Sequence, residues 1–452
     1  MKRSYEMDLC SGPLLSKILL FSLPLMLGSV FQQLYTIVDT IIIGRGVGMQ
    51  ALASIGAADW INWLVLWGLQ GFTQGFAILA AQEFGAGAYD RLRRVLAMIV
   101  KLSCWFGIAV TIISLLLVRP LLTLLHTDPA VFGGAQTYLY VQFGGSLIII
   151  AYNMAAAVLR CLGDSKTPLL AIIAASFANI ALDLLFVMGF GWGIFGASFA
   201  TVLAQLIAFL LCLRSLRRLP FVQLTKADWK TDPAILLHLC RLGIPTGLQM
   251  SMITLGGMVL QSVLNGFGVV FVAGYTAADK LYGILESASV AFGYAMTAYM
   301  GQNRGARNAA RIDTGIRAVL VLSIGFTAAI VATMLLAGKP LLGLFLSTEE
   351  AGAADALAVA HRYLMALMAF LFALFVLQAY RSSLQGLGEM TVPTLSGFAE
   401  MLMRMGAALV LPTFIGQSGV FFAEGAAWVC AAALNLVWYY IRIGKIKREM
   451  MQ

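Results

Sequence analysis

The stretch "LYTIVDTIIIGRG", residues 34–46, holds one carboxyl group, Asp39, inside an otherwise almost wholly apolar run. The nearest charged residue on its N-terminal side is Lys17. In water this would be a surface helix with one odd residue. In lipid an acid is costly at such a position and points to a function. The first question is therefore which solvent surrounds the chain.

The composition indicates lipid. Of the 452 residues, 60% are hydrophobic and 11% are charged, whereas soluble domains have about 25% charged residues. The mean hydropathy is +0.88. Apolar runs of about 20 residues, long enough to cross a bilayer as helices, recur along the chain. The short alternating segments of a transmembrane β-barrel are not visible. We therefore predict an all-α polytopic membrane protein.

Charged and Gly/Pro-rich breaks divide the chain into about twelve transmembrane helices. Their approximate limits are 18–43, 51–79, 95–118, 134–157, 168–188, 193–213, 238–265, 277–300, 316–337, 356–380, 393–413 and 418–441. Of the 30 Lys and Arg residues, 24 lie in or near the termini and the even-numbered loops, whereas three lie in the odd-numbered loops. Such a bias marks the cytoplasmic side. We expect a multi-pass protein of the plasma (cytoplasmic) membrane with both termini in the cytoplasm.

The same loops explain the net charge of +9, so no nucleic acid is expected as a partner. The six cysteines and three histidines are scattered without metal-ligand spacing. No Walker motif is present, so we expect no ATP use and no cofactor.

The chain also repeats itself. Three segments of the first half recur in the second half, in the same order and at a nearly constant offset: "AQEFGAG" from 81 matches "GQNRGAR" from 301, "RPLLTLLHTD" from 119 matches "KPLLGLFLSTE" from 339, and "LGDSKTP" from 162 matches "LGEMTVP" from 387. This predicts two six-helix bundles, 1–213 and 236–452, joined by a cytoplasmic linker, 214–235. Because six is even, the halves are a parallel repeat, for which a substrate site between them is expected.

Several motifs of the sequence resemble those of the multidrug and toxic compound extrusion (MATE) transporters. The motifs that carry the resemblance are "GPLLSKILLFSLPLMLGSVFQQLYTIVDTIIIGR", "AQEFGAG", "LRCLGDSKTP", "NIALDLLFVMGFGWGIFGASFATVLAQ", "TAADKLYGILE" and "GQNRGA". The resemblance runs over nearly the whole chain. It implies two six-helix bundles, a central cavity, alternating access, and export of organic cations driven by entry of H⁺ or Na⁺.

Three polar groups reach a similar depth in the first half. Asp39 lies six residues before Arg45, roughly 9 Å below the outer boundary of the first helix. Asp183 on the fifth span and Thr201 on the sixth lie at comparable depths. Asn179 shares a helix face with Asp183, and Tyr35 shares one with Asp39. The resemblance assigns ion coupling to an acid on the first helix, an Asn and an Asp on the fifth and a Thr on the sixth.

We therefore predict an H⁺- or Na⁺-coupling site at Asp39, Asn179, Asp183, Thr201 and Tyr35. If the ion is Na⁺, its ligands would be the oxygens of Asp39, Asn179, Asp183 and Thr201. The alternative is a structural carboxylate that pairs with Arg45 or caps a helix break. Asn153 is a further candidate, although its predicted depth also suits an interhelical hydrogen bond. Asp59 is either a third acid of this site or a residue at a wet helix end.

Substrate contacts are predicted at Glu286, Gln33 and Tyr282. Glu286 falls near mid-membrane and suits a cationic substrate, or it pairs with Lys280. The tyrosine ring can stack on an organic cation. Glu400 and Arg404, four residues apart on one predicted helix, are expected to form a buried pair.

Together these features predict a secondary active antiporter that exports small organic cations in exchange for H⁺ or Na⁺, embedded in lipid as a monomer. The alternative is a lipid-linked precursor flippase of the same superfamily, which would need a strongly cationic cavity. A membrane-embedded enzyme would need a catalytic histidine or a paired-acid motif at the membrane surface. Since neither is present, we predict that the protein is not an enzyme.

Overall fold

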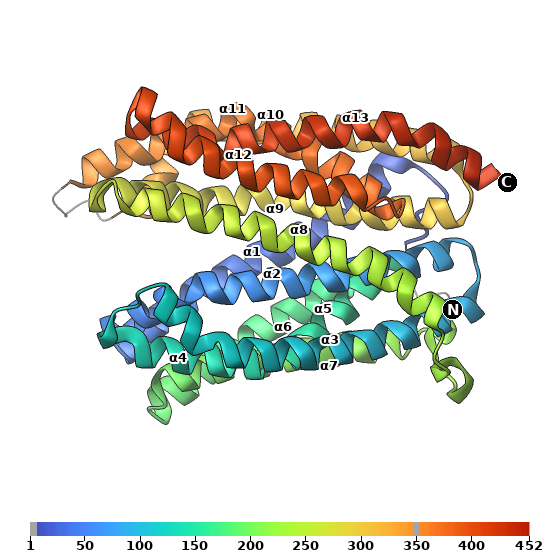
Figure 1. Cartoon of the computed structure of the whole chain (residues 1–452), viewed down its shortest axis with the longest axis horizontal. Helices are drawn as coiled ribbons and strands as arrows, with labels where there is room; N and C mark the ends of the chain where they lie inside the picture. The colour runs from blue at the N-terminus through green and yellow to red at the C-terminus, as the bar shows by residue number, and fades with distance from the viewer. Residues whose placement is uncertain (1–6, 347–351, 452) are drawn as a thin grey trace. The chain divides into compact units, whose positions relative to one another are not determined.

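The computed structural model describes residues 7–346 and 352–451, and these ranges are helical without any β-strand (Figure 1). The α-helices are α1 (Leu14–Gly46), α2 (Met49–Gly85), α3 (Tyr89–Leu124), α4 (Pro129–Gly144), α5 (Ser146–Cys161), α6 (Lys166–Asp183), α7 (Gly193–Leu216), α8 (Pro233–Asn265), α9 (Val269–Gly305), α10 (Ala309–Gly343), α11 (Ala353–Gly386), α12 (Thr391–Ile415) and α13 (Ala423–Met451). The short helices are η1 (Leu184–Gly189), η2 (Pro220–Val222), η3 (Lys226–Trp229) and η4 (Gln417–Phe422). The all-α prediction is confirmed.

The membrane-spanning character of these helices follows from their length and composition. Among the described residues, ten helices are long and apolar enough to cross a membrane, and the bent pair α4–α5 makes an eleventh span. α9 is not one of the ten; it carries Asp279, Lys280 and Glu286. Counting α9, the helices correspond one to one with the twelve predicted spans.

The fourth span differs from its prediction. We expected one continuous helix over 134–157, whereas the structure has two helices that meet at Gly145 with a bend of 50°. The side chain of Val202 on α7 occupies the space beside Gly145, so that a Cβ atom there would lie 2.5 Å from Val202 Cγ2. A glycine at the bend lets α7 approach the backbone directly.

The described chain forms two compact units. Unit 1 comprises residues up to Asp8 and Leu23–Gly247, and unit 2 comprises Leu9–Ser22 and Leu248–Gln452. The segment from Leu9 belongs to unit 2 because Leu9 N–H donates to Oε1 of Gln302 (3.2 Å) and its carbonyl accepts from Nδ2 of Asn303 (3.2 Å). Contacts and sequence repeats divide a chain by different criteria, so the halves 1–213 and 236–452 stay a prediction about the repeat.

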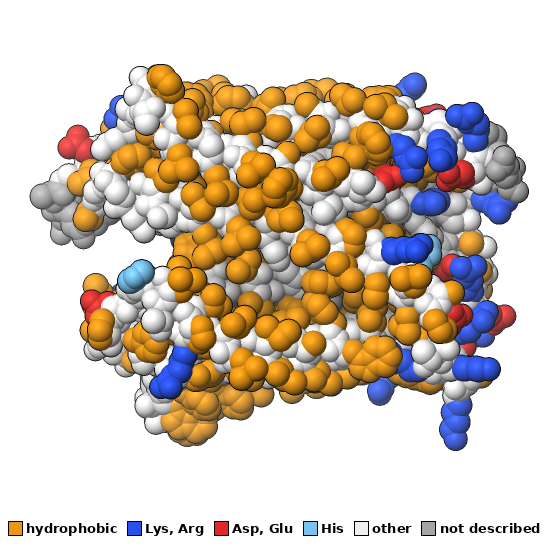
Figure 2. Space-filling view, viewed as in Figure 1, with side chains coloured by type: hydrophobic (Ala, Val, Ile, Leu, Met, Phe, Trp, Pro, Cys, Tyr) orange, Lys and Arg blue, Asp and Glu red, His pale blue; other side chains and the backbone are white. Residues whose placement is uncertain are grey.

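The surface of each unit suits lipid along the helices. Large apolar side chains are widely exposed there, as Leu116 (73%), Leu336 (86%) and Phe414 (79%) illustrate. Exposed apolar surface on this scale is unfavourable in water. In each unit, most of the visible Lys and Arg side chains gather toward one end of the helices (Figure 2). Within each unit taken by itself, the basic residues of the loops thus lie mainly at one end of the helices.

The internal repeat is visible in the helix register. α2 begins at Met49 and α9 at Val269, the same offset as between the matched segments from 81 and 301, and both helices contain 37 residues. α6 begins at Lys166 and α12 at Thr391, the same offset as between the segments from 162 and 387. The spacing of the helices thus follows the spacing of the matched sequence segments.

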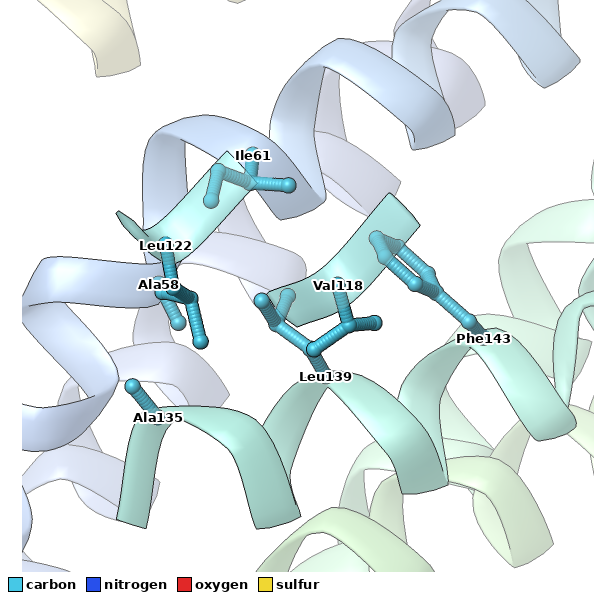
Figure 3. Close-up of a cluster of buried hydrophobic side chains, with 7 residues drawn as sticks. All are labelled: Ala58, Ile61, Val118, Leu122, Ala135, Leu139 and Phe143. Carbon is cyan, nitrogen blue, oxygen red and sulfur yellow. The ribbon is translucent and has the colours of Figure 1, made fainter. Parts of the chain in front are cut away.

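Packing inside unit 1 shows how ordinary core residues position its polar groups. Ala58 and Ile61 of α2 meet Val118 and Leu122 of α3 and three residues of α4: Ala135, Leu139 and Phe143 (Figure 3). All seven side chains are at most 2% exposed. Burial at this level stabilises by about 1.5–3 kcal/mol for each large apolar side chain. The cluster fixes the α2 and α4 faces that carry Asn62 and Tyr138.

A close helix contact in unit 1 gives a testable consequence. A Cβ atom added at Gly75 of α2 would lie 2.6 Å from Cα of Gly243 on α8 and 2.6 Å from the carbonyl oxygen of Leu242. Backbone cannot yield as a side chain can, so Gly75→Ala is expected to destabilise unit 1 by about 1–3 kcal/mol. Thermal unfolding of the purified protein in one detergent measures this.

Gly56→Ala is the matched control, because it makes the same change on the same helix with no other atom within 4 Å. Removing a glycine from a helix interior without a clash is expected to be neutral or to stabilise by up to about 1 kcal/mol. Equal melting temperatures for the two variants would contradict the contact between α2 and α8.

Candidate functional site

Two acids meet inside unit 1. Asp39 lies on α1, and Asp183 is the last residue of α6. Their carboxyl groups are close enough to interact electrostatically, and the hydroxyl group of Tyr35 interacts with both. Apolar packing from five elements holds them in place. The packing residues are Val38 and Ile42 of α1, Ala51 of α2, Ile180 of α6, Val187 of η1 and Ala197 of α7.

The polar atoms of this pair lack donors. Asp183 is fully buried, and no N–H or O–H group of the described residues donates to either of its carboxyl oxygens. The same holds for Oδ1 of Asp39 and for the amide oxygen of Asn179, which is 1% exposed. Two carboxylates are acceptors only, so neither satisfies the other until a proton or a cation lies between them. Buried unsatisfied oxygens of this kind are costly and suit an ion-binding role.

The backbone changes its winding directly after Asp183. α6 ends there and continues as the π-helix η1. The wider turn leaves the N–H of Phe190 bonded to the carbonyl of Leu185 (2.8 Å). π-helical turns are rare and frequently occur at functional sites. No proline lies in this segment, so the sequence carried no signal for the change.

A cavity opens one helical turn from the two acids. Its empty volume is about 370 Å³, part of it open to solvent. Seven of its eleven lining residues are polar: Gln32, Tyr35, Tyr152, Ser176, Asn179, Thr201 and Gln205. They come from α1, α5, α6 and α7. The cavity thus brings polar groups into a largely apolar wall, and it has room for water or a small ion beside the acids.

The remaining predicted residues of the first half are placed as follows. Thr201 lines the cavity, and its hydroxyl donates to the carbonyl of Ala197 on its own helix (3.2 Å), which leaves its oxygen free to accept. Asn153 donates from Nδ2 to the carbonyl of Ile149 (2.9 Å) and is not a lining residue. Gln33 is exposed on α1, and it is the adjacent Gln32 that lines the cavity.

Several cavity residues were not predicted. Gln32, Ser176 and Gln205 lie three or four residues from Tyr35, Asn179 and Thr201 on the same helices. Since such steps share a helix face, spacing would have found them.

Tyr138 on α4 was also missed. Its hydroxyl accepts a hydrogen bond from Nδ2 of Asn62 (3.2 Å) and interacts electrostatically with Asp39 and Asp59. No spacing along the chain relates α4 to α1, so only the fold brings Tyr138 toward this site.

Unit 2 contains a buried ion-pair network. Glu400 binds Arg381 through Oε2 (2.5 Å) and Arg404 through Oε1 (3.2 Å), which confirms the predicted pair of Glu400 with Arg404. Arg404 also binds Oε2 of Glu424 (2.8 Å) and donates to the carbonyl of Ile253 (3.0 Å). The side chains of Arg381, Glu400 and Arg404 are at most 7% exposed. The network joins α8, α11, α12 and α13.

The predicted substrate residues of the second half lie beside this network. Glu286 and Tyr282, one turn apart on α9, interact with each other. Glu286 also interacts electrostatically with Glu424 and Arg404. The partner first considered for it, Lys280, is exposed on the same helix.

Comparison with known proteins decides the family. The family model described as MatE matches residues 24–185 and again residues 245–410. The chain belongs to the MatE family. The two matches begin at Pro24 and Pro245, whose offset agrees with that of the sequence repeat. The resemblance to MATE transporters drawn from the sequence is thereby confirmed.

MatE relatives resemble this chain along its whole length. It is 32% identical to the probable multidrug resistance protein YpnP of Bacillus subtilis, with 97% of each chain covered, and 27% identical to YoeA of the same organism, with 95% and 94% covered. A crystal structure of MATE in complex with MaL6 superposes with a TM-score of 0.90 at 25% identity, covering 97% of this chain and 98% of that one.

A second MatE-like structure comes from Pyrococcus furiosus Vc1, a MOP superfamily transporter for which reverse polarity of the binding pocket suggests a different function. Its TM-score is also 0.90, at 25% identity over 99% of this chain and 100% of that one. The family, the multi-pass helical fold and the drug-efflux character of the relatives are thus established.

Proposed function

We propose that the protein exports small organic cations in exchange for H⁺ or Na⁺ by alternating access. The observation that carries this proposal is the pair of acids in unit 1, Asp39 and Asp183. Oδ1 of Asp39 and both carboxyl oxygens of Asp183 are buried without a donor, near a cavity with polar lining residues. Two like charges that share one buried site hold an ion more strongly than either alone. The coupling ion that enters the cell would therefore bind at this site.

The donor set suits either ion. A proton would lie between the two carboxyl groups, with Tyr35 as a neighbouring hydroxyl. Na⁺ would use oxygens of Asp39, Asn179, Asp183 and Thr201, because hard cations prefer oxygen ligands. Within residues 7–346 and 352–451 no group of three or more His, Cys, Asp or Glu side chains is arranged to hold a metal. A sodium site would thus depend on amide and hydroxyl oxygens.

The proposal also covers the location of the protein in the membrane and its contacts with substrate. We place the protein in the plasma membrane with both termini cytoplasmic, on the bias of Lys and Arg toward one set of loops. We propose that it acts as a monomer. Substrate contacts are proposed at Glu286, Gln33 and Tyr282. No catalytic role and no resident cofactor belong to this proposal.

The flippase alternative has less support. A pyrophosphate group would need unpaired buried cations. Arg404 is already bound by Glu400 and Glu424, and Arg381 is bound by Glu400. The described interior of unit 2 is thus better suited to a cation than to an anion.

The test is efflux from proteoliposomes loaded with ethidium, with a pH gradient or a Na⁺ gradient imposed separately. We expect efflux driven by one gradient and abolished when that gradient is collapsed. Efflux that follows neither gradient would contradict ion coupling. No efflux of ethidium or tetraphenylphosphonium by well-folded protein would contradict the export of organic cations.

A further inference from the structure

The interior of unit 2 contains more carboxyl groups than guanidinium groups among its described residues. The network and its neighbour comprise Arg381, Arg404, Glu286, Glu400 and Glu424. Glu400 accepts from Arg381 on one oxygen and from Arg404 on the other, and its charge balances that of Arg381. Arg404 then remains as the one guanidinium group for two acids, Glu424 and Glu286. The nearby Asp279 is followed by Lys280 on α9, so that pair adds no net charge.

Arg404 is incompletely satisfied in its present position. Its side chain is 7% exposed, and its Nε atom has no hydrogen-bond partner among the described residues. Its Nη2 atom is shared between Glu400 (3.2 Å) and Glu424 (2.8 Å). A guanidinium group offers five donors in a fixed fork. Arg404 therefore does not use all of its donors while one nitrogen is shared between two acids and another has no partner.

Aromatic rings complete the surroundings of the excess charge. Tyr282 stacks on Trp428, with ring centroids 5.5 Å apart and planes 24° apart, and Tyr282 interacts electrostatically with Glu286. Both rings are largely buried. Aromatic faces beside carboxylates attract organic cations, and do so most strongly where water is excluded. Hydrated metal ions gain little from such faces, so the ligand class is an organic cation.

We propose that Glu286 and Glu424 form a binding site for one monovalent organic cation, and that Arg404 is an internal cation that competes with this ligand for Glu424. This proposal rests on the proposed export of organic cations. It adds where the cation binds and which residue competes with it. Arg404 thereby sets the affinity of this site for the organic cation. It stabilises Glu424 when the site is empty and must release it when ligand binds, which keeps binding weak enough for the substrate to leave.

The test is equilibrium binding of ethidium, followed by fluorescence anisotropy, to the purified full chain. Arg404→Gln frees Glu424 and is expected to tighten binding at least about tenfold, the effect of one desolvated charge contact. Arg404→Lys keeps the competing charge and should bind nearly as wild type. Glu424→Gln should weaken binding by a similar factor, and in the double variant Arg404→Gln should no longer tighten it.

Arg381→Gln is the matched control, because it makes the same chemical change in the same network but removes a partner of Glu400 and none of Glu424. It should leave ethidium binding unchanged. An equal gain of affinity in Arg381→Gln, or none in Arg404→Gln, would overturn the site. If Arg404→Gln does not fold, Glu424→Gln decides, since unchanged binding there overturns the proposal equally.

Efflux separates the two proposals. If the wild-type protein exports ethidium and all variants bind it equally well, the export proposal stands and the proposed binding site is wrong. Wild-type protein that neither exports nor binds ethidium or tetraphenylphosphonium contradicts both.

Discussion

Asp39→Asn is expected to lower gradient-driven export to below about a tenth of the wild-type rate, which corresponds to at least about 1.4 kcal/mol in the coupled step. The amide has nearly the shape of the carboxyl group but cannot take up a proton, and it offers Na⁺ a neutral ligand in place of a charged one. It also removes the repulsion from Asp183, so that the remaining acid no longer responds to the driving gradient as one of a pair. Efflux of ethidium from proteoliposomes under the active gradient measures this.

Asp183→Asn should give a loss of the same size, because either change leaves one acid where two are needed. Asp128→Asn is the matched control. Asp128 caps α4 in an exposed loop, where its Oδ1 accepts from the N–H of Ala130 (2.7 Å), and asparagine caps helices about as well. Undiminished export by Asp39→Asn, at equal amounts of folded protein, would remove Asp39 from the coupling site.

The second large effect is on stability. Glu400→Gln is expected to destabilise unit 2 by about 3–5 kcal/mol, because removing one member of a buried network leaves charge uncompensated. Glu400 neutralises Arg381 and shares Arg404 with Glu424, at distances of 2.5, 3.2 and 2.8 Å. After the change Arg381 has no carboxylate partner in the network. A much lower melting temperature in detergent, with reduced yield of monodisperse protein, is the expected observation.

Asp90→Asn is the control for this prediction. Asp90 pairs with Arg93 at the start of α3, but its side chain is 89% exposed. Ion pairs exposed to water contribute about 0–1 kcal/mol to stability, so this variant should have nearly the melting temperature of the wild type. Equal melting temperatures for Glu400→Gln and Asp90→Asn would mean that the buried network adds no stability.

The sequence by itself determined the fold class, the succession of long helices and the repeat. These features depend on local composition and spacing: apolar runs long enough for a bilayer, basic residues between them, and segments that recur in the second half at a nearly constant offset. It also singled out Asp39, Asp183, Glu286 and the Glu400–Arg404 pair, because charge inside an apolar run is conspicuous wherever the chain folds.

Only the tertiary structure decided which polar groups meet. Tyr138 on α4 interacts electrostatically with Asp39 on α1, and Glu424 on α13 forms an ion pair with Arg404 on α12. No spacing along the chain relates the helices of either pair. Likewise the bend at Gly145 and the π-helix after Asp183 depend on contacts with α7 and on local winding that no residue pattern marks. Helical periodicity specifies the face on which a side chain lies. It does not specify the helix that the face meets, because that choice is made by packing among all the helices at once.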